Sequence, residues 1–235
     1  MDLASLQRMK QERRKIVGVV AWDYQIAQIV DRAGVELVSV GDSVGVNLWG
    51  QKEGEITLEE MLTVCRAVRR GVKRALLSCD LPPAFIGIDN AKRLLDAGAD
   101  MVKVEAGPET VARIAGAGIP LFAEFHGGRP SAELVDEAKA LEAAGAALLD
   151  FRHSGPQAGA AVVQAVSVPV LGGLGGGPWL DGRLRMAHAA IGYACSHLDS
   201  KTETYANVAR MALEALGAYA DDVRAARHLK GQRPA

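Results

Sequence analysis

Acidic residues end several short apolar runs in this sequence, and they are the first sign of chemistry. The runs VELVSVGD, RALLSCD and DMVKVE finish in Asp42, Asp80 and Glu105. Three carboxylates offer hard oxygen ligands, which suit Mg²⁺ because it takes a few carboxylates and keeps water or substrate oxygens elsewhere. Zn²⁺ fits less well, since no His or Cys cluster has a suitable spacing. The pattern predicts a divalent metal, most simply Mg²⁺, held by these three residues.

A lysine accompanies the third carboxylate. Lys103 lies two residues before Glu105, so in a strand both side chains point the same way. A lysine beside a metal can bind a substrate carboxylate or stabilise an enolate. Asp42 or Asp80 alone could equally cap a following helix. The four residues together favour a catalytic site.

Two further runs end in groups that could move protons. IPLFAEF carries Glu124, with His126 just beyond it in HGGRP, and AALLDF carries Asp150, followed by Arg152. A carboxylate or imidazole there could act as a general acid or base. Asp150 could also be structural, and His126 could belong to a flexible glycine loop. The sequence leaves open which of the three moves the proton.

The elements that must position these groups alternate regularly. Eight short apolar runs, typical of strands buried on both faces, alternate with amphipathic segments. The expected strands are 15–22, 35–42, 74–80, 100–105, 119–125, 146–151, 168–173 and, less clearly, 189–195. Helices are expected over 24–33, 57–70, 89–97, 131–144 and 156–165.

Glycine closes four of the helical segments, in RAGVE, DAGAD, GAGIP and AAGAA. This is typical of the loop from a helix to the next strand. We therefore expect a single (β/α)8 TIM barrel over residues 1–235 rather than an open doubly wound sheet. An N-terminal helix (1–14) and a C-terminal helical tail (201–235) complete it. The run LGGLGGGPWLDG (171–182) lacks either phosphate-loop pattern, which favours a backbone-lined active-site wall.

Bulk properties exclude some classes of partner. The chain has 235 residues and a net charge of −1, with no long block of one sign. This argues against nucleic-acid and membrane-surface binding, which need a basic footprint. The N-terminal stretch is charged throughout, no run approaches a membrane span, and the three cysteines are widely spaced. A cytoplasmic protein is expected.

An ordered set of motifs resembles the ketopantoate hydroxymethyltransferase family, within the phosphoenolpyruvate mutase/isocitrate lyase superfamily. The motifs run nearly end to end: LQRMKQERRKIVGVVAWDY, VGDSVGVNLWG with ITLEEML, CDLPP, NAKRLLDAGADMVKVEAG, AGIPLFAEF, VPVLGGLGGGPWLDGRLRMAHAAIGY and KTETYANVARMALEALGAYADDVRA. The resemblance implies that Asp42 and Asp80 hold Mg²⁺, with Glu105 in or next to its shell. Ser43 and Lys103 would bind the carboxylate of a 2-oxo acid, 3-methyl-2-oxobutanoate or a relative.

The same resemblance implies that 5,10-methylenetetrahydrofolate is the co-substrate that supplies the one-carbon unit. It also implies a homo-oligomer, as large as a decamer. Asp150 stands where the family usually has Glu, and Glu124 or His126 stands where it has His. The loop after the fifth strand is shorter than in the family. These departures surround the substrate, so we expect a divergent member with an altered 2-oxo acid or one-carbon partner.

Two other functions compete with this hypothesis. The first is a folate-independent Mg²⁺/enolate aldolase or C–C lyase of the same superfamily. Its lyases typically carry a KKCGH-like motif, which this sequence lacks. The second is a degenerate relative kept as a binding partner. The presence of Asp42, Asp80, Lys103 and Glu105 argues against that second function.

Overall fold

The computed structural model describes residues 1–231 and contains a closed barrel of eight parallel strands in sequential order. The strands are β1 (Ile16–Val20), β2 (Leu37–Val40), β3 (Leu76–Asp80), β4 (Met101–Glu105), β5 (Leu121–His126), β6 (Ala146–Arg152), β7 (Val170–Gly172) and β8 (Gly182–Met186). The (β/α)8 TIM barrel expected from the sequence is confirmed. Short aliphatic runs form these strands because a parallel barrel is covered on both faces, so the apolar side chains on both sides of each strand are buried.

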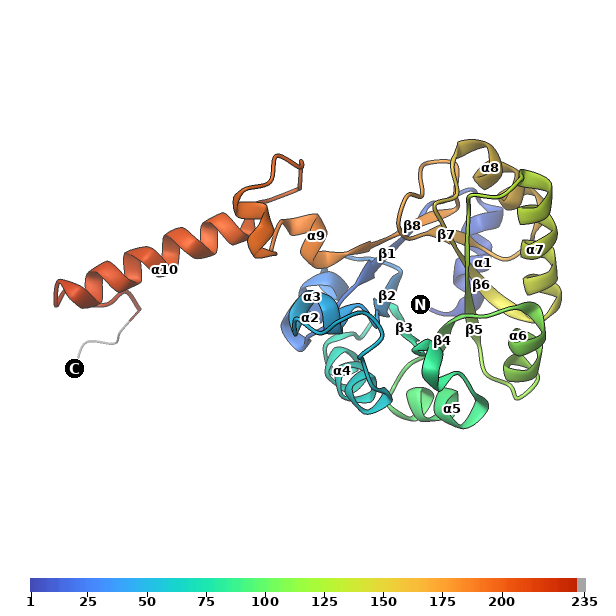
Figure 1. The fold of residues 1–235 in the computed structure, drawn as a ribbon, viewed down its shortest axis with the longest axis horizontal. Coiled ribbons are helices and arrows are strands. Elements are labelled where there is room, and N and C mark those ends of the chain that lie inside the picture. The colour runs from blue at the N-terminus through green and yellow to red at the C-terminus, as the bar shows by residue number, and fades with distance from the viewer. Residues whose placement is uncertain (232–235) are drawn as a thin grey trace. The chain divides into compact units, whose positions relative to one another are not determined.

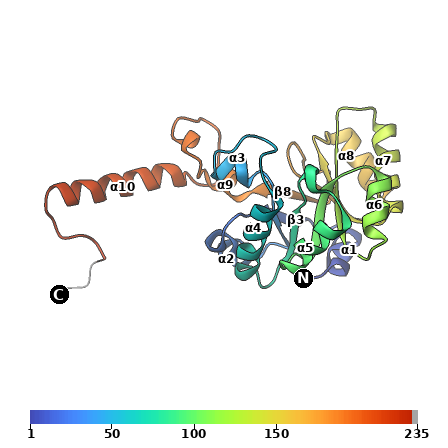
Figure 2. The same ribbon diagram turned by 60° about the horizontal axis from the view of Figure 1, so that its bottom comes forward.

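Helices cover the outside of this barrel (Figure 1). The helical elements before Met186 are α1 (Leu3–Gln11), α2 (Tyr24–Arg32), α3 (Val44–Leu48), α4 (Leu58–Gly71), the 3₁₀ turn η1 (Pro83–Phe85), α5 (Ile88–Asp96), α6 (Pro108–Ala115), α7 (Ser131–Ala143) and α8 (Pro156–Ala165). Neighbouring helices α6 and α7 lie side by side against the strands (Figure 2). In such a barrel the interior is filled by side chains, so a ligand can bind only at an end of the barrel.

Local sequence signals account for the ends of these helices. Thr57 and Glu60 form the expected capping box at the start of α4. Gly98, between α5 and β4, has φ 107°, and Gly34, Gly118 and Gly145 of the other three repeated phrases also have positive φ. Glycine adopts this conformation without steric cost, so each phrase ends a helix and turns the chain into the next strand.

The eighth strand is not where the apolar pattern predicted it. Residues 189–195 were expected to form it, but they lie in α9 (Ala187–Ile191) and the turn that follows. The strand is instead GRLRM, whose arginines obscure its pattern because only alternate residues face the core. Segment 173–181, which links β7 to β8, contains no helix. Its glycines and Pro178 disfavour one.

The chain divides into two compact units, Met1–Arg185 and Met186–Ala235. The second contains α9, the 3₁₀ turn η2 (Cys195–Leu198) and α10 (Val208–Arg224). Asn207 caps α10 through its side chain, and Arg210 donates to the Leu198 carbonyl. Within residues 1–231, no helix combines the length and hydropathy needed to cross a membrane.

Candidate active site

The register of the strands brings the predicted polar residues together at the carboxyl end of the barrel. Asp80 pairs with Lys103, while Glu105, Glu124 and Asp150 are neighbours on β4, β5 and β6. Residues in register on adjacent strands point to the same face. Five side chains from four strands thus share one end of the barrel. This is the end where TIM barrels carry their active sites.

Lys103 lies at the centre of a buried ion-pair cluster. Its ammonium lies 3.6 Å from Asp80 Oδ2 and 3.2 Å from Asp150 Oδ2, and it donates a hydrogen bond to Glu124. Burial alone would lower the pKa of Lys103, but the three carboxylates outweigh it and raise the pKa. Lys103 therefore stays protonated and acts as a fixed cation rather than a base.

Of the three carboxylates around Lys103, Asp80 lies farthest from the ammonium. Its Oδ1 is buried and makes no hydrogen bond among the described residues. Burial, with help from the charges of Asp42 and Glu124, raises the pKa of Asp80 to about 7 against the opposing effect of Lys103. A buried oxygen without a partner costs free energy, so it marks a place for a ligand or an ion.

Glu124 and Asp150 are held differently from Asp80. Burial would raise the pKa of Glu124, but Lys103 and Arg152 lower it, so this side chain is ionised at neutral pH. Arg152 places Nη1 2.7 Å from Glu124 Oε1. Asp150 is fully buried, and its Oδ1 accepts the Gly173 N–H at 2.8 Å. The glycine-rich segment thus contributes its backbone to the site.

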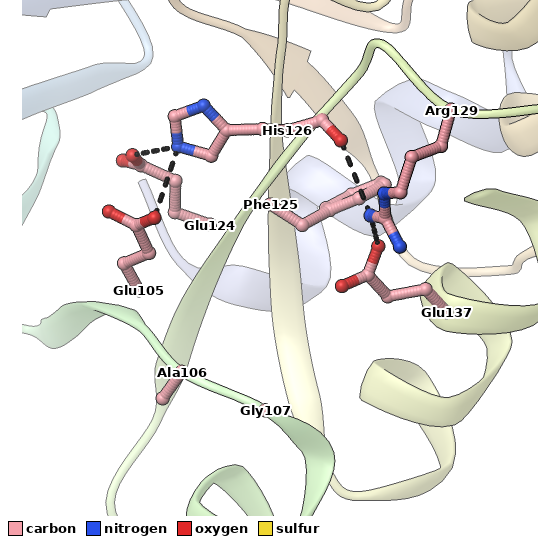
Figure 3. A pocket seen from close by; sticks show the side chains of 8 residues that line it. All are labelled: Glu105, Ala106, Gly107, Glu124, Phe125, His126, Arg129 and Glu137. Atoms are coloured by element: carbon pink, nitrogen blue, oxygen red, sulfur yellow. Dashed lines mark hydrogen bonds and ion pairs between the residues drawn. The ribbon is translucent and has the colours of Figure 1, made fainter. Parts of the chain in front are cut away.

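His126 links the buried cluster to the surface. Its Nε2 lies 3.2 Å from Glu124 Oε1 and 3.3 Å from Glu105 Oε1 (Figure 3). Within residues 1–231, these three side chains form the group whose possible metal-ligand atoms lie within 4.8 Å of one another. They line a pocket of about 310 Å³, together with the ion pair of Arg129 and Glu137.

Of the three expected metal ligands, Glu105 belongs to the group around His126. Glu105 turns toward His126 and Glu124, and its side chain is 57% exposed, while Asp42 and Asp80 stand outside that group. Asp42 is half-buried, and its charge acts on Asp80. Ser43 precedes α3 without capping it, so its hydroxyl is not committed to the helix.

Arg152 is a residue of the site to which the sequence pattern assigned no role. It lies two residues beyond Asp150, in register with His126 on β5. The rule that linked Lys103 to Glu105 applies here too, because alternate residues of a strand share a face. Applied to β6, the same spacing would have placed Arg152 at the site.

Comparison with known proteins settles the family. The family model "Ketopantoate hydroxymethyltransferase" matches residues 1–228. The 3-methyl-2-oxobutanoate hydroxymethyltransferase of Halalkalibacterium halodurans is 32% identical, over 94% of this chain and 89% of its own. The enzyme of that name from Shewanella sp. (strain W3-18-1) is 35% identical, over 94% of each chain. The chain belongs to the ketopantoate hydroxymethyltransferase family. It is therefore an enzyme of the hydroxymethyltransferase type.

Solved structures support the same architecture. A 2,3-dimethylmalate lyase, described as a PEP mutase/isocitrate lyase superfamily member, superposes with a TM-score of 0.65. It covers 99% of this chain and 91% of its own at 14% identity. At that identity the likeness speaks for the fold alone. It agrees with the sequential closed barrel described above.

Proposed function

We propose that this chain transfers a hydroxymethyl group from 5,10-methylenetetrahydrofolate to the enolate of a 2-oxo acid, 3-methyl-2-oxobutanoate or a relative, using Mg²⁺. The observation that carries the proposal is the buried Lys103, surrounded by Asp80, Glu124 and Asp150. A fixed cation among carboxylates at a strand end suits the formation and stabilisation of an enolate. The names of the curated relatives support the choice of reaction.

The donor set is compatible with Mg²⁺. Asp80 offers a buried oxygen that has no hydrogen bond in the described part of the chain, and Asp42 adds a second carboxylate whose charge acts on it. These two residues would hold the ion, with Glu105 beside them. Oxygen ligands of this kind match its preference. When bound, Mg²⁺ would act as a Lewis acid toward the keto oxygen of the substrate.

The protein's own groups account for the proton and the charge. Asp150 Oδ2 is buried and makes no hydrogen bond within residues 1–231, although it faces the Lys103 ammonium at 3.2 Å. It is the best placed of the three acid/base candidates to accept the C3 proton. Glu124 is disfavoured as a base because its pKa is lowered, and His126 lies farther out. Lys103 and Ser43 would bind the substrate carboxylate, and Lys103 would also stabilise the enolate.

A direct test separates enolate formation from one-carbon transfer. Protein, Mg²⁺ and 3-methyl-2-oxobutanoate are incubated in deuterated water, and C3–H exchange is followed by NMR with and without 5,10-methylenetetrahydrofolate. We expect exchange in both cases and a hydroxymethylated product only with the folate. Exchange without any folate-dependent product would favour the folate-independent aldolase or lyase. No exchange with any short 2-oxo acid would overturn both.

The acid/base assignment is tested with a conservative variant. Asp150→Asn is expected to slow C3–H exchange by about 10²–10⁴-fold, the usual contribution of a general base. Asp100→Asn, at the opposite end of the barrel, is the matched control and should leave exchange unchanged. Equal rates in Asp150→Asn and the wild type would assign the proton to Glu124 or His126 instead.

The partners follow the same line of inference. We propose a cytoplasmic homo-oligomer, a decamer being one form, with α10 as a subunit contact. Its apolar side chains are exposed, including Met211 at 65% and Leu216 at 67%. Such a stripe is typical of an interaction surface. Leu216→Glu should lower the mass measured by light scattering, whereas Glu214→Gln should not. An unchanged mass in Leu216→Glu would exclude α10 as the contact.

A further inference from the structure

Arg152 and Lys103 approach the same carboxylates from opposite directions. In the strand register, Lys103 lies two residues deeper in the barrel than the level of Glu124 and Asp150. Arg152 lies two residues beyond that level, at the open carboxyl end, called the mouth below. Each step of two residues along a strand is about 6.6 Å. A substrate held by its carboxylate near Lys103 would therefore extend its other end toward Arg152.

The guanidinium of Arg152 has binding capacity that its neighbours do not use. It has five N–H donors. Nη1 forms an ion pair with Glu124, whereas Nε lies 3.8 Å from Asp150 Oδ2 and has no hydrogen-bond acceptor among the described residues. The side chain is 28% exposed, so part of it is accessible to a ligand.

The pocket at the mouth is poorly suited to a hydrocarbon side chain. It is lined mainly by charged or ionisable groups: Glu105, Glu124, His126, Arg129 and Glu137. Phe125, which also borders it, is 3% exposed and stacks on Phe151. A purely aliphatic substituent would gain little burial against apolar surface here, and Arg152, which pairs with the lining residue Glu124, supplies a cation for an anionic one.

We propose that Arg152 binds a second, distal carboxylate of the substrate, so that this chain prefers 2-oxo acids with an anionic end to 3-methyl-2-oxobutanoate. The inference rests on the proposed function for the position of the 2-oxo end. Arginine suits the role because its planar fork matches a carboxylate. Glu124 would then share the guanidinium with the ligand rather than saturate it.

The test compares two acids that differ only at the distal end. 2-Oxoglutarate and 2-oxopentanoate share the 2-oxo carboxylate and chain length, and one ends in a carboxylate, the other in a methyl group. Their affinities for wild type, Arg152→Met and Arg152→Lys are measured by calorimetry with Mg²⁺ present. We expect the wild type to bind 2-oxoglutarate about tenfold or more tightly than 2-oxopentanoate. Arg152→Met should abolish this preference, and Arg152→Lys should retain part of it.

Arg69→Met is the matched control, because Arg69 forms an ion pair with Asp100 at the amino end of the barrel, away from the substrate. It should leave the preference unchanged. Equal wild-type affinities, a preference that survives in Arg152→Met, or an equal loss for both acids in that variant would overturn the proposal. C3–H exchange is measured on the same samples. A charge preference without exchange would refute the proposed reaction while supporting the distal subsite.

Discussion

Carboxylates gather at both ends of the barrel, but their partners differ. At the amino end, acidic side chains accept backbone N–H groups where strands begin. Asp31 accepts from Arg74 and Ala75, Asp100 from Leu77, Glu142 from Ser167 and Val168, and Asp181 from Val170. At the carboxyl end, Asp80, Glu124 and Asp150 instead surround the ammonium of Lys103.

This difference separates structure from function. Backbone donors are fixed by the fold, so the amino-end carboxylates are satisfied once the barrel has formed. The carboxyl-end group depends on two side-chain cations, Lys103 and Arg152, and among the described residues it leaves oxygens of Asp80 and Asp150 without hydrogen bonds. Buried polar groups without hydrogen bonds lower the stability of the fold. In enzymes such groups occur where a bound ligand supplies the missing partner.

The largest contrast is expected when each end loses its lysine. Lys103→Met should slow C3–H exchange by about 10²–10³-fold. It should also lower the free energy of unfolding by about 3–5 kcal/mol, because buried carboxylates lose their cation. Lys10 pairs with Asp181 at the amino end, at 2.9 Å. Lys10→Met should cost only about 1 kcal/mol, since Asp181 keeps the Val170 N–H, and exchange should be unaffected.

Urea denaturation and NMR exchange measure the two quantities. If both substitutions destabilise equally, the carboxylates at the two ends depend on lysine to the same degree. The proposed division between the ends would then be wrong. A fully active Lys103→Met would instead remove that residue from the mechanism.

The next contrast uses pH at the carboxyl end. Burial raises the pKa of Asp80 from 3.8 to about 7, so the unfolded chain releases this proton at lower pH than the folded protein does. Ionisation of Asp80 therefore destabilises the metal-free fold as pH rises from about 4 to 7. Asp80→Asn mimics the neutral form. With EDTA present, its free energy of unfolding at pH 8 should exceed that of the wild type by up to about 4 kcal/mol. At pH 4 the two free energies should be equal.

The same variant should lose Mg²⁺-dependent exchange. Greater stability joined to lost activity would identify Asp80 as a functional carboxylate held at a cost. Lower stability at pH 8 would show that the Lys103 ion pair outweighs burial, so that the folded protein lowers the pKa of Asp80 instead of raising it. Asp100→Asn, at the amino end, serves as the control and should not be stabilised.

The sequence predicted the barrel well because seven strands are continuous apolar runs, which have few alternative structures. It failed at β8, where Arg183 and Arg185 interrupt the pattern and the more apolar 189–195 drew the assignment. The strand-end rule correctly gathered Lys103, Glu124 and Asp150, because parallel strands bring their carboxyl ends together. Side-chain direction was harder to predict, and Glu105 shows this by turning to His126.

The division between the two ends was also hidden in the sequence. Asp31 lies inside α2, and nothing in its neighbourhood shows that it accepts amides more than forty residues away. Such partners arise only when α2 and the segment before β3 come together in the fold. The sequence therefore predicts where carboxylates collect, whereas their hydrogen-bond partners require the tertiary structure.

The smallest contrast concerns one amino-end carboxylate. Burial would raise the pKa of Asp31, but the amides of Ala75 and Arg74 outweigh it and lower the pKa. Its stabilising effect is thus present above the unfolded pKa near 4 and is lost as pH falls through the folded value. Asp31→Ala should cost about 2 kcal/mol at pH 7 and less at pH 3, measured by urea denaturation, with C3–H exchange retained. This pH dependence has the opposite sign to that of Asp80. A loss that grew toward acid would mean that amide donors do not distinguish the two ends of the barrel.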